Sequence, residues 1–159
     1  GASFAGGLMV AGAQDKQAAQ ESERKVKEFD VPAAALAARK KLAAGAPIME
    51  FAEEIEHGCK YYEGSWKGPD GNVDGLVTDA GDVVEIEESI PADKAPPGVR
   101  SAAEKEAGKD GKITWERKTV YLYEIHFKKD GKGRELVFTA DARRFAEPGQ
   151  HDESDEDEK

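Results

Sequence analysis

The chain has 159 residues, of which 38% are hydrophobic and 35% are charged, and its formal net charge is −10. This length allows one domain of ordinary size or two small units that share a lean core. An acidic chain without a basic stripe argues against binding to nucleic acid. The single cysteine, Cys59, excludes a fold held by internal disulfides, and we interpret it as a passive thiol in a hairpin loop.

The two ends of the chain differ in composition from its middle. Residues 4–13 are small and apolar, and Ala11-Gly12-Ala13 fits the pattern of a signal peptidase site. We interpret residues 1–25 as a signal-peptide remnant with a flexible lead-in, with an ordinary Gly/Ala-rich terminus as the alternative. Residues 148–159 are predicted to be a disordered acidic tail, because residues 151–159 hold six acids and no apolar side chain.

Residues 26–91 predict a helix followed by four strands. Asp30-Val31-Pro32 provides a helix start, because Asp can cap free amides and Pro is tolerated in the first turn. The helix covers Ala33 to Ala44 and ends at Gly45 and Pro47. Strands separated by turn residues are expected to follow at 48–56, 61–67, 73–78 and 83–88. In the first of these strands, Met49 and Phe51 are expected to face the core.

Residues 92–147 predict a second unit of the same order, with a short helix ending at Ala107 and a strand at 113–118. Alternating apolar side chains then predict a strand with one buried face, formed by Tyr121, Tyr123, Ile125 and Phe127. Asp130-Gly131 predicts a tight hairpin, and a short last strand is expected near 143–146. We therefore predict an α+β fold in which two tandem helix-plus-meander repeats form one antiparallel sheet with helices on one face.

These motifs resemble the PepSY-like domain over about residues 26–147. The first repeat contributes Val31-Pro32-Ala33-Ala34, Tyr62-Glu63, Asp70-Gly71 and Asp79-Ala80-Gly81-Asp82-Val83. The second contributes Pro96-Pro97-Gly98-Val99, Tyr123-Glu124-Ile125, Asp130-Gly131 and Ala140-Asp141-Ala142. Two positions depart from the pattern: Arg143 stands where a turn glycine is expected, and Gly64 interrupts a strand.

The resemblance extends to the fold of the secreted β-lactamase inhibitory proteins, which are built from related tandem repeats. It implies a secreted or periplasmic module with a binding or inhibitor-like role, without catalysis and without a cofactor. A secreted or envelope protein is the partner that this implies.

The sheet face directed away from the helices is the candidate binding surface. Strand alternation places these residues on it: Tyr61, Glu63, Lys67, Leu122, Glu124, His126 and Lys128. Aromatic anchors ringed by polar groups suit protein interfaces. A plain solvated face of an antiparallel sheet is the alternative.

One segment matches the first half of a calcium loop. Asp70-Gly71-Asn72-Val73-Asp74-Gly75 has the required spacing, but Gly81 stands where the loop needs a bidentate Glu. A hairpin turn between two strands explains the same residues. A calcium-responsive structural module that uses Asp70, Asn72 and Asp74 is therefore the alternative function.

Catalytic motifs are absent from the sequence. His57, His126 and His151 lack zinc-motif spacing. The sequence contains no nucleophilic triad, phosphate-binding glycine loop or dinucleotide fingerprint. We expect a protein that is not an enzyme, has no transmembrane segment and is a monomer.

Overall fold

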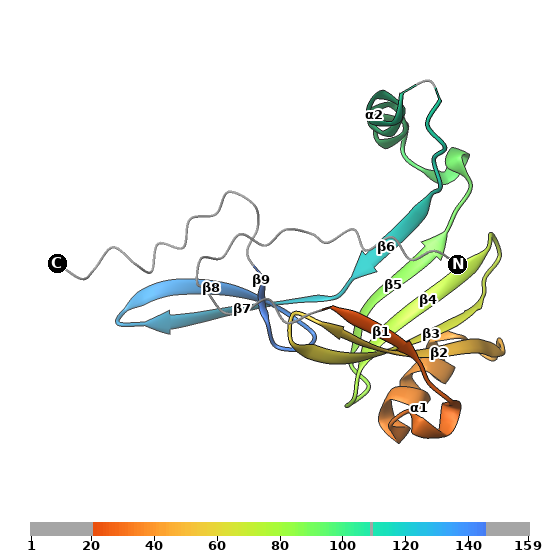
Figure 1. The fold of residues 1–159 in the computed structure, drawn as a ribbon. Coiled ribbons are helices and arrows are strands. Elements are labelled where there is room, and N and C mark those ends of the chain that lie inside the picture. Colours follow the sequence, from red (N-terminus) through yellow and green to blue (C-terminus); the bar gives the residue numbers. More distant parts are fainter. Residues whose placement is uncertain (1–20, 109, 146–159) are drawn as a thin grey trace.

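The computed structural model describes residues 21–108 and 110–145, which form a mixed α/β structure of mostly antiparallel strands (Figure 1). The chain begins with β1 (Ser22–Lys25), a 3-10 turn (Glu28–Asp30) and α1 (Ala33–Leu42). It continues with β2 (Ile48–Glu56), β3 (Cys59–Lys67), β4 (Asn72–Thr78) and β5 (Val83–Ser89). A second 3-10 turn (Ala92–Lys94) then precedes α2 (Pro97–Ala107). The chain ends with β6 (Glu116–Val120), β7 (Leu122–Lys129), β8 (Lys132–Thr139) and β9 (Arg144–Phe145).

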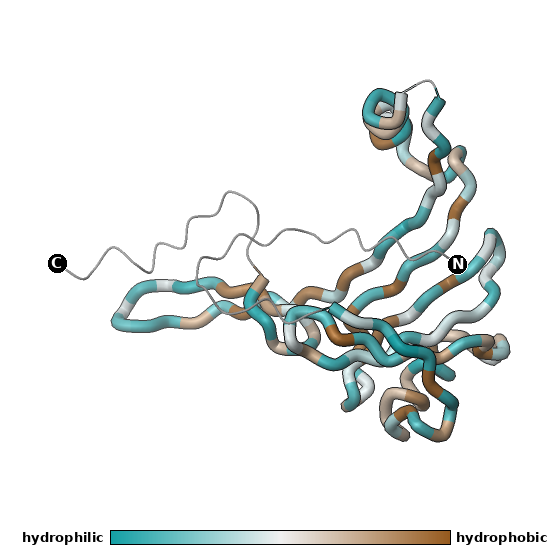
Figure 2. Tube along the Cα trace, in the orientation of Figure 1, coloured by the Kyte–Doolittle hydropathy of each residue, from teal (hydrophilic) through white to brown (hydrophobic). Residues whose placement is uncertain are grey.

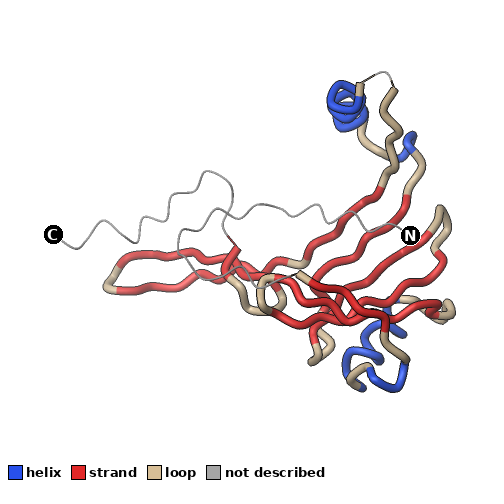
Figure 3. The backbone as a smooth tube through the Cα atoms, viewed as in Figure 1, coloured by secondary structure: helices blue, strands red, loops and turns tan. Residues whose placement is uncertain are grey.

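The strands form two sheets, so the single continuous sheet predicted from the sequence is wrong. One sheet has six strands in the order β1 to β6, and the other has three in the order β7 to β9. Figure 3 shows that the two helices lie at separate places beside these strands. The predicted signal-like segment and acidic tail lie outside the described residues. The last part of the predicted flexible lead-in forms β1, which pairs with β2.

Tight turns connect the strands where the sequence predicted them. Asp130 and Gly131 have φ of 53° and 76°, so the predicted hairpin between β7 and β8 is confirmed. His57 and Gly58 form the same kind of turn between β2 and β3, with φ of 51° and 77°. Two successive residues with positive φ match the right-handed twist of paired strands.

Helix α1 covers one side of the six-stranded sheet and makes the core of the described structure. Ala35 is fully buried and packs with Val31, Tyr62 and Val77. A neighbouring cluster joins Ala43 to Trp66 and Val73. Tyr62 and Trp66 share one side of β3, as their spacing of four residues predicts.

A bulge in β2 changes which of its side chains face this core. The pairing between β2 and β3 shifts between Ile48 and Glu50, so Met49 has no partner in the ladder. Ile48 and Phe51 pack against the core, whereas Met49 is 48% exposed. The predicted inward position of Phe51 is confirmed and that of Met49 is wrong, because a bulge breaks the alternation of side chains.

A buried arginine explains the glycine in the middle of β3. Arg39 is fully buried, and its guanidinium carbon lies 5.6 Å from the ring centre of Phe51 and 6.0 Å from that of Tyr62. A Cβ atom on Gly64 would come within 2.7 Å of the Arg39 Cδ. Gly64 therefore makes the room that the Arg39 side chain occupies against the backbone of β3.

The second half of the chain is more open than the sequence predicts. β6 pairs with β5 and not with β7, so residues 116–129 run almost without interruption from one sheet into the other. The predicted buried face of Tyr121, Tyr123, Ile125 and Phe127 is 38–54% exposed. Helix α2 has no buried residue, so it does not cover a sheet face as α1 does. The predicted pattern of two equivalent helix-plus-meander repeats is therefore not confirmed.

We predict that Gly64→Ala lowers the free energy of unfolding by about 1–3 kcal/mol, because the added methyl overlaps Arg39. Arg39→Met should be neutral or stabilising, since a buried charge without hydrogen bonds contributes little to stability. Urea unfolding of Arg39→Met, Gly64→Ala, Arg39→Ala and the Gly64→Ala/Arg39→Ala double variant measures both effects and their coupling. If Gly64→Ala lowers the free energy of unfolding equally in the wild-type and Arg39→Ala backgrounds, the predicted overlap between the added methyl and Arg39 is contradicted.

Candidate functional site

The side of the six-stranded sheet that is turned away from α1 carries a group of carboxylates. Side chains alternate along each strand, so the neighbours of Tyr62 and Gly64 in β3 point to this opposite side. Besides Glu50 and Glu56 of β2, the strand register aligns six acidic residues there, from β1 to β5. We call this group the acidic face: Glu23, Glu54, Glu63, Asp74, Glu85 and Glu87.

Glu54 and Glu63 are the centre of the acidic face. Burial raises the pKa of Glu63 to about 9, and its hydrogen bond with Glu54 and the charges of Glu54, Asp74 and Glu23 add to the effect. Burial also raises the pKa of Glu54. Two carboxyl groups this close cannot both ionise without large repulsion. The pair therefore holds a proton between its oxygens at neutral pH.

Basic side chains neutralise only one end of the acidic face. The Lys118 Nζ lies 3.0 Å from Glu85 and 2.6 Å from Glu87. Within residues 21–108 and 110–145, no ion pair joins a basic group to Glu23, Glu54 or Glu63. At the β1–β3 end of the face, Glu23, Glu54 and Glu63 therefore carry negative charge that no direct ion pair neutralises among the described residues. Lys25 of β1 pairs instead with Glu50.

Arg39 lies behind this end of the face, on the α1 side of the sheet. Burial lowers the pKa of Arg39 to about 10, and the charges of Glu63 and Glu54 act in the opposite direction. The Nε and both Nη atoms of Arg39 have no hydrogen-bond partner among the described residues. The carboxyl pair thus acts on Arg39 through its electric field, across the strand that separates them.

Tyr61, predicted as an exposed anchor of the binding surface, is instead 1% exposed. It packs with Leu76 and Val84, and its hydroxyl donates a hydrogen bond of 2.5 Å to the Asp141 Oδ2. The Arg143 Nε lies 2.5 Å from the same carboxylate. The turn before β9 therefore covers Tyr61 and attaches the three-stranded sheet to the six-stranded one.

The remaining residues of the predicted surface lie in two separate places. Glu63 belongs to the acidic face, and Lys67 is exposed at the end of β3, where its Nζ donates a hydrogen bond to Asn72. The other four are exposed on β7: Leu122, Glu124, His126 and Lys128. The structure thus brings Glu63 together with acids that were not predicted, and it leaves the β7 residues on a different sheet.

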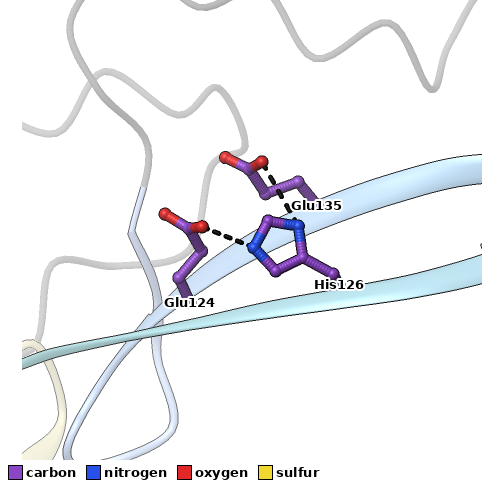
Figure 4. Close-up of side chains that lie close together, drawn as sticks. All are labelled: Glu124, His126 and Glu135. Atoms are coloured by element: carbon purple, nitrogen blue, oxygen red, sulfur yellow. Dashed lines mark ion pairs between the residues drawn. The ribbon is translucent and has the colours of Figure 1, made fainter.

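His126 is the centre of a small cluster on the β7–β8 hairpin. Its Nε2 lies 2.6 Å from Glu124 and its Nδ1 3.5 Å from Glu135, which faces it from β8 (Figure 4). One imidazole and two carboxylates can bind a divalent metal ion, as can the three glutamates Glu23, Glu54 and Glu63. All three residues of the His126 cluster are exposed to solvent.

The residues of the predicted calcium loop have other partners. Asp70 forms an ion pair of 2.5 Å with Lys94, and Asn72 accepts a hydrogen bond from Lys67. Asp74 lies within β4 and accepts a hydrogen bond from the Ser65 hydroxyl. Their oxygens point to three different neighbours, and calcium binding at Asp70, Asn72 and Asp74 stays a prediction.

Sequence reasoning missed five residues of the site: Glu23, Glu54, Glu85, Glu87 and Arg39. Nothing in the sequence around Glu54 shows that β3 brings Glu63 against it. Gly64 in the middle of a strand was the available signal for Arg39, since a strand glycine marks a close approach of another group. Cys59 begins β3 and is half-buried against the Tyr61 cluster, so it is not the loop thiol that was predicted.

Comparison of the chain with protein-family models and with curated proteins gave no match. Among the residues that the structure describes, neither helix has the length and apolar character needed to cross a membrane.

We predict that the stability of the chain falls as the pH rises above 4.5 toward 9. Glu63 keeps its proton in the folded chain over this range, whereas an ordinary Glu in the unfolded chain releases it. Glu63→Gln should flatten this decline and stabilise the protein by about 1 kcal/mol at pH 8. Urea unfolding between pH 5 and pH 9 measures the effect, with the exposed Glu104→Gln as the matched control. Parallel curves for wild type and Glu63→Gln would refute the shifted pKa.

Tyr61→Phe is expected to destabilise the chain by about 1–3 kcal/mol and to loosen the turn before β9, because it removes the hydrogen bond to Asp141. Hydrogen exchange should accelerate in residues 140–145 first. Tyr121→Phe, at a position that is 39% exposed, should change neither quantity. Unaltered exchange at 140–145 in Tyr61→Phe would show that this bond does not attach the two sheets.

Proposed function

We propose that this chain is a secreted or periplasmic, non-enzymatic binding module of the PepSY-like type, and that its acidic face receives a cationic segment of a protein partner. The observation that carries the proposal is the group of Glu23, Glu54 and Glu63, to which no ion pair is formed among the described residues. An inhibitor-like role is the form of binding that the resemblance suggests. The order of helix, strands, helix and strands supports the PepSY-like assignment.

The electrostatics of the face favour a positively charged partner. Carboxyl groups with raised pKa values lie in the face with too few cations around them. A Lys or Arg side chain placed beside Glu54 and Glu63 would replace the shared proton and let both groups ionise. Binding should therefore release a proton and strengthen as the pH rises from 6 to 9.

The extent of the face favours a segment with several charges over a single ion. Glu23, Glu54 and Glu63 lie close enough to hold one cation. Asp74, Glu85 and Glu87 extend the negative surface over two further strands. Such a field steers a polycation and increases its association rate, with a strong dependence on salt.

A labelled oligolysine peptide tests the proposal. Fluorescence anisotropy should detect binding at low salt and weaker binding at physiological salt. Glu54→Gln combined with Glu63→Gln should weaken binding about tenfold or more, since charge-assisted hydrogen bonds are lost. The pair Asp93→Asn and Asp110→Asn removes at least as much negative charge, at exposed positions outside the acidic face, and should change the affinity less than about twofold.

Three results would overturn the proposal. Equal loss of affinity in both double variants would show that only net charge matters. Absence of oligolysine binding would remove the acidic face as a site for a cationic segment. Heat from calcium binding that Asp70→Ala abolishes, together with absent oligolysine binding, would favour the calcium-responsive alternative at Asp70, Asn72 and Asp74.

A further inference from the structure

The β7–β8 hairpin presents an apolar face that nothing in the described chain covers. Tyr123, Ile125 and Phe127 point to one side of β7 and are 54%, 44% and 38% exposed. Phe138 and Leu136 of β8 pair with Tyr123 and Ile125 and extend the same face. Figure 2 shows hydrophobic residues along these strands. We call these five residues the hairpin face. A continuous apolar surface of this kind marks an interaction site.

Helix α2 is the second uncovered apolar element. None of its residues is buried, and Val99 is 53% exposed. Val99, Ala102, Ala103 and Ala107 follow helical spacing, which places them along one side. Helix α1 shows how such a small-residue helix is used in this chain, because it buries Ala35 against Tyr62 and Val77.

The attachment of α2 keeps it away from the centre of its own hairpin face. Both ends of α2 are attached near the same point, because Ser89 pairs with Glu116 and the Ile90 amide donates a hydrogen bond to the Trp115 carbonyl. The connecting segments, residues 90–96 and 108–115, reach at most about 24–28 Å when fully extended. Ile125 lies nine residues beyond Glu116 along one strand direction, about 30 Å away.

Figure 1 shows the same separation. Helix α2 lies beyond the start of β6, and the β7–β8 hairpin extends from the other end of the same strand. The pairing of β6 with β5 over five residues keeps the two surfaces apart.

We propose that two copies of this chain form a dimer in which α2 of each copy covers the hairpin face of the other. If the two strands at residues 116–129 run antiparallel about a two-fold axis near Tyr121, the start of β6 in one copy lies beside the middle of β7 in its partner. Each α2 is then within reach of the partner's Tyr123, Ile125 and Phe127. The dimer has two-fold symmetry, so both hairpin faces and both α2 helices are covered and neither is left to bind a further copy.

The charges on the hairpin face favour this exchange over direct packing of two hairpin faces. Lys129, Lys132 and Arg134 lie on the same side as Phe127 by register, near the tip of the hairpin. Two identical faces would bring no acid to these cations. Helix α2 carries Glu104 and Glu106 in its second half, which can meet these cations, and Arg100 and Lys105 balance the net charge of the helix.

Exchange forms two equivalent helix-on-sheet contacts per dimer, whereas packing of two hairpin faces against each other forms one contact. The dimer replaces the monomer expected from the sequence. The proposed dimer does not depend on the proposed cationic partner. Lys118 forms an ion pair with the acidic face. Side chains alternate along residues 116–129, so the hairpin face lies on the opposite side of the strand from Lys118.

Light scattering with size-exclusion chromatography tests the assembly on the full chain. Wild type should elute with the mass of a dimer. Ile125→Lys should shift it to a monomer with at least a tenfold weaker dimer affinity and an unchanged circular dichroism spectrum. Ser101→Lys introduces the same charge on the side of α2 opposite Val99 and should stay dimeric. A monomeric wild type at all concentrations would overturn the proposal.

Disulfide trapping tests the exchange itself. In a Cys59→Ser background, chains with Val99→Cys are mixed with chains with Ile125→Cys and oxidised. The proposal predicts a disulfide between unlike chains. Two results contradict it: a bond only between two Ile125→Cys chains, or no bond between the mixed chains.

Discussion

The structure depends on how β3 separates two opposite charge environments. On one side, Arg39 is buried between aromatic rings and against Gly64, without a hydrogen-bond partner among the described residues. On the other side, Glu54 and Glu63 share a proton. Each environment alone is unfavourable, because burial penalises charged groups. Across the thin layer of one strand, the two fields partly compensate each other.

This constraint connects the core to the candidate site. Gly64 has no side chain on the α1 side, so the Arg39 guanidinium can approach the strand whose next residue is Glu63. A substitution of Arg39 in the core therefore changes the electric field at Glu63, although the two side chains are not in direct contact. The acidic face is built into the centre of the sheet and is more than a set of surface charges.

The second half of the chain uses its strands differently. In the first half, hairpin after hairpin adds strands to one sheet, and α1 covers them. In the second half, residues 116–129 pair with β5 at one end and with β8 at the other. That choice of partner exposes Tyr123, Ile125 and Phe127 and leaves α2 without a sheet to cover.

The sequence predicted the local structure well, because local signals decide it. Pro32 and Gly45 bracket α1, and Asp130-Gly131 fixes a hairpin through its positive φ values. The sequence could not predict which strand β6 would pair with, since pairing depends on contacts between distant segments. It placed Tyr61 on the surface by alternation, and the turn at Asp141 covers that position. Glu63 was predicted to be part of the binding surface, but its proton-sharing partner depends on the register of β2 against β3.

The most direct test of the account is a carbon NMR titration of the Glu63 carboxyl group in the folded chain, with and without bound oligolysine. The account predicts a midpoint of about 9 in the free protein. It also predicts that the midpoint falls when the peptide binds, because the peptide cations replace the shared proton. A midpoint near the ordinary value of 4.5, unchanged by the peptide, would contradict both the carboxyl pair and the function built on it.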